Sequence, residues 1–272
     1  PSGFSKAWVR GEKPSLLLEA DATDPAAAAM AVAQIKPIVD RTLADIQIGS
    51  FDYLKPKPSS ITTLVHNKYN PEGISQFNIV PGLLGVILTM TMVMITSIAM
   101  TREAERGTME NLLAMPSKPL EVMIGKITPY VLMGLVQTII ILLASNMLFH
   151  LPFVGSGSTF GLGVGLFILA NLAIGFTFST IAKSQMQAMQ LTFFFFLPSM
   201  LLSGFMFPFQ GMPKWAQYLG EIPPLTHFLR IVRGIMLKGT SLSLLSNEFL
   251  ALLAILIIVG IIAMLRYRQT LD

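Results

Sequence analysis

The chain has 272 residues, of which 53% are hydrophobic and only 12% are charged, and it contains no cysteine. A typical soluble domain carries about 25% charged residues, so this composition excludes an ordinary soluble protein. The net charge of +4 does not indicate nucleic-acid binding, because the basic residues lie beside the apolar segments, where they set orientation in a membrane. The absence of cysteine excludes disulfides, thiolate metal ligands and a cysteine nucleophile.

Residues 1–78 are the most polar part of the chain, with eight basic and eight acidic residues. The segments 15–20 and 61–66 are typical of strands, and the apolar period between them predicts a helix. Asp24 is suited to cap the start of this helix, with Pro25 in its first turn. The strand–helix–strand order predicts a small α/β domain over residues 1–78.

The remainder of the chain, residues 79–272, is predicted to be a transmembrane domain. A helix needs about 20 apolar residues to cross the hydrocarbon core of a membrane. Five segments without Asp, Glu, Lys, Arg or His meet this need, namely 79–101, 127–149, 160–182, 191–209 and 249–265. The fourth contains Pro198 and Gly204, which predict a kink or a break. The fold class expected is therefore an all-α polytopic membrane protein with a small external α/β domain.

Lysine and arginine counts in the connecting segments predict the orientation. Seven of these residues lie in 102–126, in 183–190 and in the C-terminal tail, whereas four lie in 210–248 and none in 150–159. This bias favours a cytoplasmic C-terminus and an external position for residues 1–78. Because a hydrophilic domain of that size does not cross a membrane unaided, we expect an additional spanning helix upstream, which would make six in the intact protein.

The segment 101–119 has the pattern of two short helices between two spans. Gly107 interrupts the helical period, and Thr108 can cap a second helix that exposes Leu112 and Leu113 on one face. Such a helix suits docking into a groove of a partner protein, and it equally suits lying on the lipid surface. The residue pattern alone leaves both interpretations open.

Three motifs in this chain resemble those of type-2 ABC exporter permeases, in the order found in that family. The first comprises Arg106, Gly107, Thr108, Met109, Glu110, Leu112, Leu113 and Pro116. The second comprises Pro198, Ser203, Gly204, Phe207, Pro208, Met212, Pro213, Trp215, Pro224, Leu225, Thr226, Arg233, Gly234, Lys238 and Gly239. The third and weakest comprises Tyr69, Asn70, Pro71 and Glu72 with Val80, Pro81 and Gly82. The subgroup with a large external domain after its first span is the most similar.

The resemblance implies a pump of two permease subunits, identical or different, and two ABC ATPase subunits, in the plasma membrane (the inner membrane of a bacterium). The family that the chain resembles exports drugs and polysaccharides, so the resemblance implies export of a substrate, for which a drug-like or lipophilic compound is one expected class. It also implies that the ATPase contacts residues 106–113 within the segment 101–119, called the docking segment below, at Arg106, Gly107, Thr108, Glu110, Leu112 and Leu113. The chain has no G-x-x-x-x-G-K-[ST] phosphate-binding loop. We therefore expect a transport subunit that is not an enzyme and binds no cofactor or metal, with ATP and Mg²⁺ on the partner ATPase.

Two other groups of residues are candidates for function. Phe193, Phe196, Phe205 and Phe207 could line a path for apolar substrates, although packed or lipid-facing aromatic residues are the simpler interpretation. The segment 223–238 interleaves apolar residues with basic ones and predicts an interfacial or re-entrant helix in contact with lipid. The residues expected to matter in this segment are Pro224, Arg230 and Arg233. We expect the basic side chains to extend toward the lipid headgroups and Trp215 to lie at headgroup level.

Glycines and histidines add little to the functional hypothesis. Gly161 and Gly165 have the spacing that permits close helix packing. His66, His150 and His227 are too scattered along the chain to suggest a metal site.

Three other classes of membrane protein are alternatives to an exporter permease. An ion-driven secondary transporter usually needs ionisable groups at membrane depth, and the five spans have none. A membrane enzyme needs a nucleophile with a base, or clustered acids or histidines, and the sequence offers no such cluster. A purely structural membrane protein remains open, although it would not need the pattern of residues 101–119.

Overall fold

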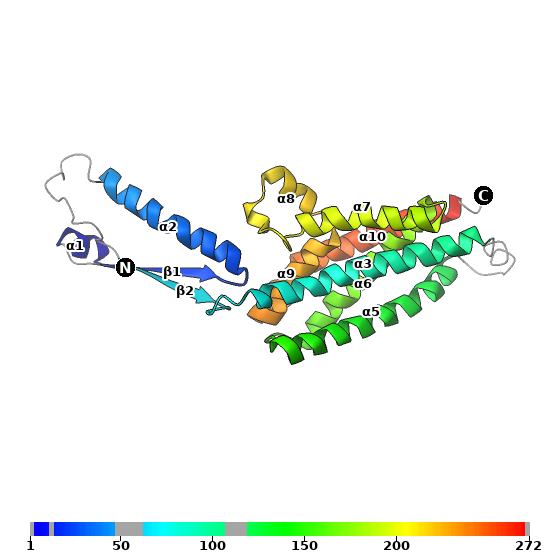
Figure 1. The fold of residues 1–272 in the computed structure, drawn as a ribbon, viewed down its shortest axis with the longest axis horizontal. Coiled ribbons are helices and arrows are strands. Elements are labelled where there is room, and N and C mark those ends of the chain that lie inside the picture. The colour runs from blue at the N-terminus through cyan, green and yellow to red at the C-terminus, as the bar shows by residue number, and fades with distance from the viewer. Residues whose placement is uncertain (1–2, 11–13, 47–61, 107–118, 270–272) are drawn as a thin grey trace. The chain divides into compact units, whose positions relative to one another are not determined.

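The structure is a computed structural model that describes residues 3–10, 14–46, 62–106 and 119–269. The chain divides into two compact units, Pro1–Asn78 and Ile79–Asp272. Figure 1 shows the helices and strands of each unit, and the two units are described separately below.

The described part of the first unit contains a parallel pair of strands joined through a helix. Its elements in chain order are α1 (Phe4–Val9), β1 (Ser15–Asp21), α2 (Pro25–Ile46) and β2 (Thr62–Lys68). The strands pair in register from Ser15 opposite Thr62 to Asp21 opposite Lys68. The carboxylate of Asp24 accepts the backbone N–H groups of Ala26 and Ala27 at 3.1 and 3.2 Å, so it caps α2 as predicted.

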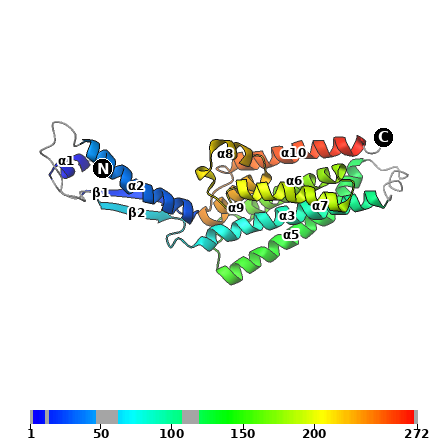
Figure 2. The same ribbon diagram turned by 45° about the horizontal axis from the view of Figure 1, so that its top comes forward.

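All secondary-structure elements in the described residues of the second unit are helices. Its elements are α3 (Ser75–Glu105), α5 (Pro119–Phe149), α6 (Gly157–Ile181), α7 (Gln185–Leu202), η2 (Phe209–Gly211), α8 (Lys214–Gly220), α9 (Pro224–Lys238) and α10 (Ser246–Gln269). The long helices run alongside one another in both ribbon views, and the shorter α8 and α9 lie at one end of the bundle (Figures 1 and 2). This arrangement is that of an all-α polytopic membrane protein.

Among the described residues, four helices are long and apolar enough to cross a membrane, namely Ser75–Glu103, Gly125–Phe149, Gly157–Ile181 and Ser246–Arg266. The predicted span over 191–209 coincides only in part with α7. That helix runs through Pro198 without a break and ends at Leu202, just before Gly204, whose backbone φ is +82°. The predicted break therefore lies at the glycine and not at the proline.

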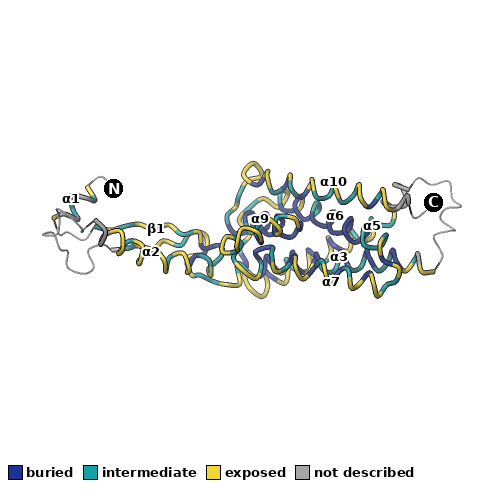
Figure 3. Tube along the Cα trace, turned by 90° about the horizontal axis from the view of Figure 1, so that it is seen from above, coloured by how far each residue is buried: buried dark blue, intermediate teal, exposed yellow. Residues whose placement is uncertain are grey.

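Helix α6 is the most enclosed of the four candidate spans, and much of its tube is dark blue in Figure 3. It packs against α5, α7, α9 and α10. Gly175 permits a close approach to α3, because a Cβ atom there would lie 2.7 Å from the Val93 carbonyl oxygen. Gly161 and Gly165, the pair with the packing spacing, have no such neighbour within 4 Å. Within the described part of this chain, that pair makes no close helix contact.

Helix α9 packs inside the bundle through its apolar face. The rings of Phe228 on α9 and Phe167 on α6 are stacked, with centroids 3.9 Å apart and planes 4° from parallel. The side chains of Leu225, Leu229, Ile231, Val232 and Ile235 are also buried. Full burial of an aliphatic side chain stabilises a folded protein by about 1.5–3 kcal/mol in water. Inside a membrane, where burial from water no longer acts, close packing of side chains stabilises the association of helices. The helix is therefore held by protein contacts along most of its length.

Candidate functional site

The first candidate site is the end of the bundle where α3 finishes and α5 begins. Arg106 is the first residue of the docking segment and the last described residue before position 119, and it is exposed, with its N–H donated to the Arg102 carbonyl at 3.2 Å. The other predicted docking residues, Gly107, Thr108, Glu110, Leu112 and Leu113, lie outside the described residues.

Two carboxylates organise this end of the bundle. Glu103 on α3 forms an ion pair with Lys126 on α5, so the two helices that flank the docking segment are tied to each other. Glu105, at the last position of α3, accepts the backbone N–H of Gln185 at 2.8 Å and the side-chain Nε2 of the same residue at 2.6 Å. These two hydrogen bonds lower the pKa of Glu105, because they favour the ionised carboxylate.

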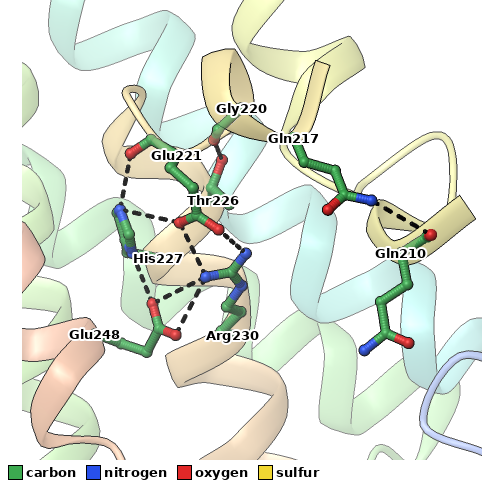
Figure 4. Close-up of polar contacts among 8 residues, drawn as sticks. All are labelled: Gln210, Gln217, Gly220, Glu221, Thr226, His227, Arg230 and Glu248. Carbon is green, nitrogen blue, oxygen red and sulfur yellow. Dashed lines mark hydrogen bonds and ion pairs between the residues drawn. The ribbon is translucent and has the colours of Figure 1, made fainter. Parts of the chain in front are cut away.

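The second candidate site is an ionic cluster at the opposite end of the bundle, where α8, α9 and α10 meet (Figure 4). We define the cluster as Glu221, His227, Arg230 and Glu248. Local structure places its members. Pro223 and Pro224 start α9, and the Thr226 hydroxyl donates to the Gly220 carbonyl, which holds the turn between α8 and α9. His227 and Arg230 are three residues apart and therefore share one side of α9.

Arg230 is the centre of the ionic cluster. Its Nη2 and Nη1 donate to the two oxygens of Glu221 at 2.6 and 3.0 Å, which is the paired geometry that a guanidinium forms with a carboxylate. Nη1 also reaches Glu248 at 3.2 Å. The guanidinium carbon lies 4.7 Å from the ring centroid of Phe209, a cation–π contact with η2. Arg230 thus joins η2, the α8–α9 turn and α10.

His227 completes the cluster through both ring nitrogens. Nδ1 lies 2.6 Å from Glu248 Oε2, and Nε2 lies 2.9 Å from the Glu221 carbonyl oxygen. Both partners are acceptors when Glu248 is ionised, so this geometry favours a hydrogen on both nitrogens, which is the imidazolium form. Burial alone would lower the pKa of His227, but the hydrogen bonds to Glu248 and Glu221 and the two negative charges outweigh it and raise the pKa.

The structure gives the basic residues on α9 partners within the protein. Two carboxylates and an aromatic ring hold Arg230, and its extension toward headgroups stays a prediction. Arg233 donates from Nη1 to the Gly204 carbonyl at 3.1 Å, which connects α9 with the end of α7. Trp215 on α8 is 65% exposed, and its position at headgroup level stays a prediction.

The four candidate phenylalanines do not share one environment. Phe193 and Phe207 are 39% and 56% exposed, whereas Phe196 on the same helix as Phe193 is buried. Phe205 is half-buried, and its ring lies against Gly82 of α3. Phe193 and Phe207 are therefore the members of this set that present apolar surface outside the bundle.

The sequence reasoning missed the ionic cluster. It treated the histidines as scattered and the arginines as lipid-facing, although the three-residue spacing of His227 and Arg230 was a signal for a shared polar face. Within the described ranges, no group of three or more His, Asp or Glu side chains is placed to hold a metal ion. The cluster is an internal brace whose carboxylates are already occupied by the histidine and the arginine.

Comparisons with known proteins give a consistent result. The family model described as ABC-2 type transporter matches residues 57–237. The chain is 31% identical over 269 residues to the probable multidrug ABC transporter permease YbhR of Escherichia coli K12, covering 99% of this chain and 72% of that protein. It is 31% identical over 282 residues to the inner membrane transport permease YhhJ of the same organism, covering 100% and 72%.

A eukaryotic protein is similar over a shorter range. The chain is 28% identical over 215 residues to ABC transporter G family member 20 of Dictyostelium discoideum, covering 77% of this chain and 29% of that protein. No solved structure matches the chain.

Proposed function

Because this chain belongs to the ABC-2 type transporter family, it is a membrane permease subunit of an ABC exporter, and we propose that a separate ATPase subunit binds ATP and Mg²⁺ and hydrolyses the ATP that drives it. The observation that carries this proposal is the family match over residues 57–237, together with a bundle of apolar helices. The family assignment also decides against an ion-driven carrier. The working pump would contain two ATPase subunits and a second permease subunit, identical or different.

The docking segment, residues 106–113, is the proposed contact with the ATPase. Its support comes from the fixed positions of its flanks, because Glu103 and Lys126 tie α3 to α5. Helices held together in this way would move as a unit when a partner displaces the segment between them. The leucines at 112 and 113 would supply the apolar contact, and Glu110 a polar one.

The proposed topology has five spans in this chain, with α7 as the fourth. Residues 1–78 form an external domain, and the C-terminus is cytoplasmic, in the inner membrane of a bacterium. The seven-to-four distribution of basic residues supports this orientation. It would place the docking segment on the side where ATP is present and the ionic cluster on the external side.

The proposed substrate is a drug-like or lipophilic compound. Two relatives are named as probable multidrug permeases, YbhR and YbhS of Escherichia coli K12. The apolar surface offered by Phe193 and Phe207 would suit such a compound, whereas Phe196 serves in packing. Apolar compounds partition into the bilayer, so a path along exposed aromatic residues could be entered from the lipid.

A reconstitution experiment tests the proposed function. The full protein would be purified with and without its co-expressed ATPase subunit and placed in lipid vesicles. The permease alone should not hydrolyse ATP, and the complex should hydrolyse ATP and move a lipophilic dye. Hydrolysis by the permease free of ATPase would contradict the assignment of ATP to a separate chain.

A substitution in the docking segment tests the proposed contact. Leu112→Asp should abolish both capture of the ATPase and dye transport while the permease still inserts, because a carboxylate does not pack in an apolar groove. The matched control is Leu244→Asp, since Leu244 is 77% exposed and lies between α9 and α10. Retention of the ATPase by the Leu112→Asp permease would show that the docking assignment is wrong.

A further inference from the structure

Glu105 links two helices that are far apart in sequence. It is the last residue of α3, and both of its carboxylate oxygens accept hydrogen bonds from Gln185, the first residue of α7, 80 positions later. The docking segment begins immediately after it, at Arg106. The hydrogen bonds of Glu105 with Gln185 therefore connect the docking segment with the start of α7.

The chemistry of this contact is that of a helix cap supplied by another helix. The first N–H groups of a helix have no partner within the helix, and a negative charge near them is favourable. In α7 the Ser184 hydroxyl accepts the N–H of Gln187 at 3.2 Å, and the Gln187 side chain accepts the N–H of Lys183 at 2.7 Å. Glu105 takes the N–H of Gln185, so α3 provides the part of the cap that α7 does not provide itself.

This contact is exposed, and exposed contacts between charged and polar groups add little to stability. Its geometry is nevertheless specific, because Glu105 binds both the side chain and the backbone N–H of Gln185. The neighbouring ion pair of Glu103 with Lys126 holds α5 to the same end of α3. Two carboxylates on the last turn of α3 thus fasten both flanks of the docking segment to each other and to α7.

Helix α7 is suited to receive a displacement. It packs on α6 through the edge contact of Phe195 with Phe178, whose centroids are 5.7 Å apart. It carries Phe193 on its exposed surface and ends at the turn that holds Gly204. A shift at its first residue would therefore reach the apolar surface proposed for the substrate.

We propose that Glu105 is a positioning residue of the transport cycle, which transmits movement of the docking segment to α7 through Gln185. This inference rests on the proposed function, because it needs an ATPase that displaces the docking segment. The contact is kept during the movement, so α7 follows the end of α3. Glu105 itself contacts neither ATP nor the ATPase groove in this role.

An exchange of the two side chains tests the proposal. Gln185→Glu places two carboxylates opposite each other, and Glu105→Ala removes both acceptors. The double variant Glu105→Gln with Gln185→Glu restores both hydrogen bonds, because the amide introduced at 105 can accept the backbone N–H and donate to the new carboxylate. The double variant keeps the net charge of the unsubstituted protein. Glu105→Ala and Gln185→Glu change that charge in opposite directions, so a general effect of surface charge would shift the two single variants in opposite directions, whereas loss of the contact lowers both.

The measurement is dye transported per ATP hydrolysed in vesicles that contain the permease and its ATPase. We expect Gln185→Glu and Glu105→Ala to lower this ratio about fivefold, the effect of losing one exposed polar contact, and the double variant to restore it. Capture of the ATPase should be unchanged in all variants. An unchanged ratio in the single variants, or no rescue in the double variant, would overturn the proposal.

The same experiment separates this proposal from the proposed function. If the unsubstituted permease neither captures an ATPase nor transports dye, the proposed function fails before Glu105 is tested. If Glu105→Ala releases the ATPase as Leu112→Asp is expected to, Glu105 is part of the docking surface and the positioning role is wrong.

Discussion

The imidazole of His227 and the carboxylate of Glu248 meet at 2.6 Å, between Nδ1 and Oε2, and this contact fastens α10 to α9. The second ring nitrogen faces a carbonyl oxygen, so the arrangement favours the charged form of the histidine. Loss of its proton would leave a lone pair facing an acceptor at one of the two positions. We therefore expect the order of the α9–α10 end to depend on pH.

The first prediction concerns that dependence. The pKa of His227 is raised in the folded state above its ordinary value of about 6.5 by its contacts with Glu248 and Glu221, although burial opposes the shift. Its contribution is therefore complete below about pH 6.5 and is lost as the pH rises through the raised pKa. The melting temperature of the solubilised protein should fall over that range. His227→Gln should remove this fall.

His150→Asn is the matched control for this experiment. His150 is exposed, and its backbone φ of +48° is one that asparagine tolerates. The control should show the same pH profile as the unsubstituted protein. An identical profile for His227→Gln would contradict the preference for the charged imidazole.

The second prediction concerns Arg230. Arg230→Met should destabilise the protein by about 1–2 kcal/mol, because two carboxylates lose their shared partner and partial exposure limits the cost. Adding Glu248→Gln should recover part of the loss, since one unpaired charge is removed. Arg230→Lys should be intermediate, because an ammonium group cannot form the paired contact with Glu221. Denaturation of the unsubstituted protein, Arg230→Met, Glu248→Gln and the double variant forms a double-mutant cycle that measures the coupling. Strict additivity of the two single effects would refute it.

The third prediction concerns the contact of α6 with α3. Gly175→Ala should destabilise the bundle by about 1–3 kcal/mol, because the new methyl group would lie 2.7 Å from the Val93 carbonyl oxygen. Gly165→Ala on the same helix meets open space and should be neutral or slightly stabilising. Thermal unfolding of both variants in detergent checks the pair. Equal melting temperatures would mean that α3 and α6 do not approach closely at Gly175.

The fourth prediction concerns the proposed topology. Since the chain has no cysteine, single cysteines can be introduced without background labelling. A membrane-impermeant thiol reagent added to whole cells should label Ser156→Cys before α6 and should not label Lys183→Cys or Thr270→Cys until the membrane is opened. Lys183 is preferred to Ser184, which caps α7. Labelling of both Ser156→Cys and Lys183→Cys in intact cells would mean that α6 does not span the membrane.

Local features were predictable from the sequence. The Asp24 cap, the two strands and the four long apolar helices each depend on residues close together in the chain. Their periods and capping residues can be read from one segment at a time. The end of α7 was only partly predictable, because Pro198 and Gly204 both predict an interruption and only the glycine adopts a backbone that ends the helix.

The two sites depend on residues that are distant in sequence. Glu248 lies 18 residues from Arg230, and Gln185 lies 80 residues from Glu105, so neither pairing follows from periodicity. Which glycine approaches another helix is also decided by packing, as Gly175 and Gly165 illustrate. A charge on a helix such as α9 can face lipid headgroups or an internal partner, and only the position of that partner decides between them.

The enclosed position of α6 matters for biogenesis. During synthesis α6 leaves the ribosome well before α9 and α10, which later cover it. Until then the face of α6 at Gly163, which Ile231 of α9 and Phe249 of α10 cover in the folded subunit, has no protein neighbour from those two helices. The nascent subunit therefore passes through a stage in which its central helix is uncovered. Chains shortened before α9 would remain at that stage, and quality-control proteases of the membrane should clear them.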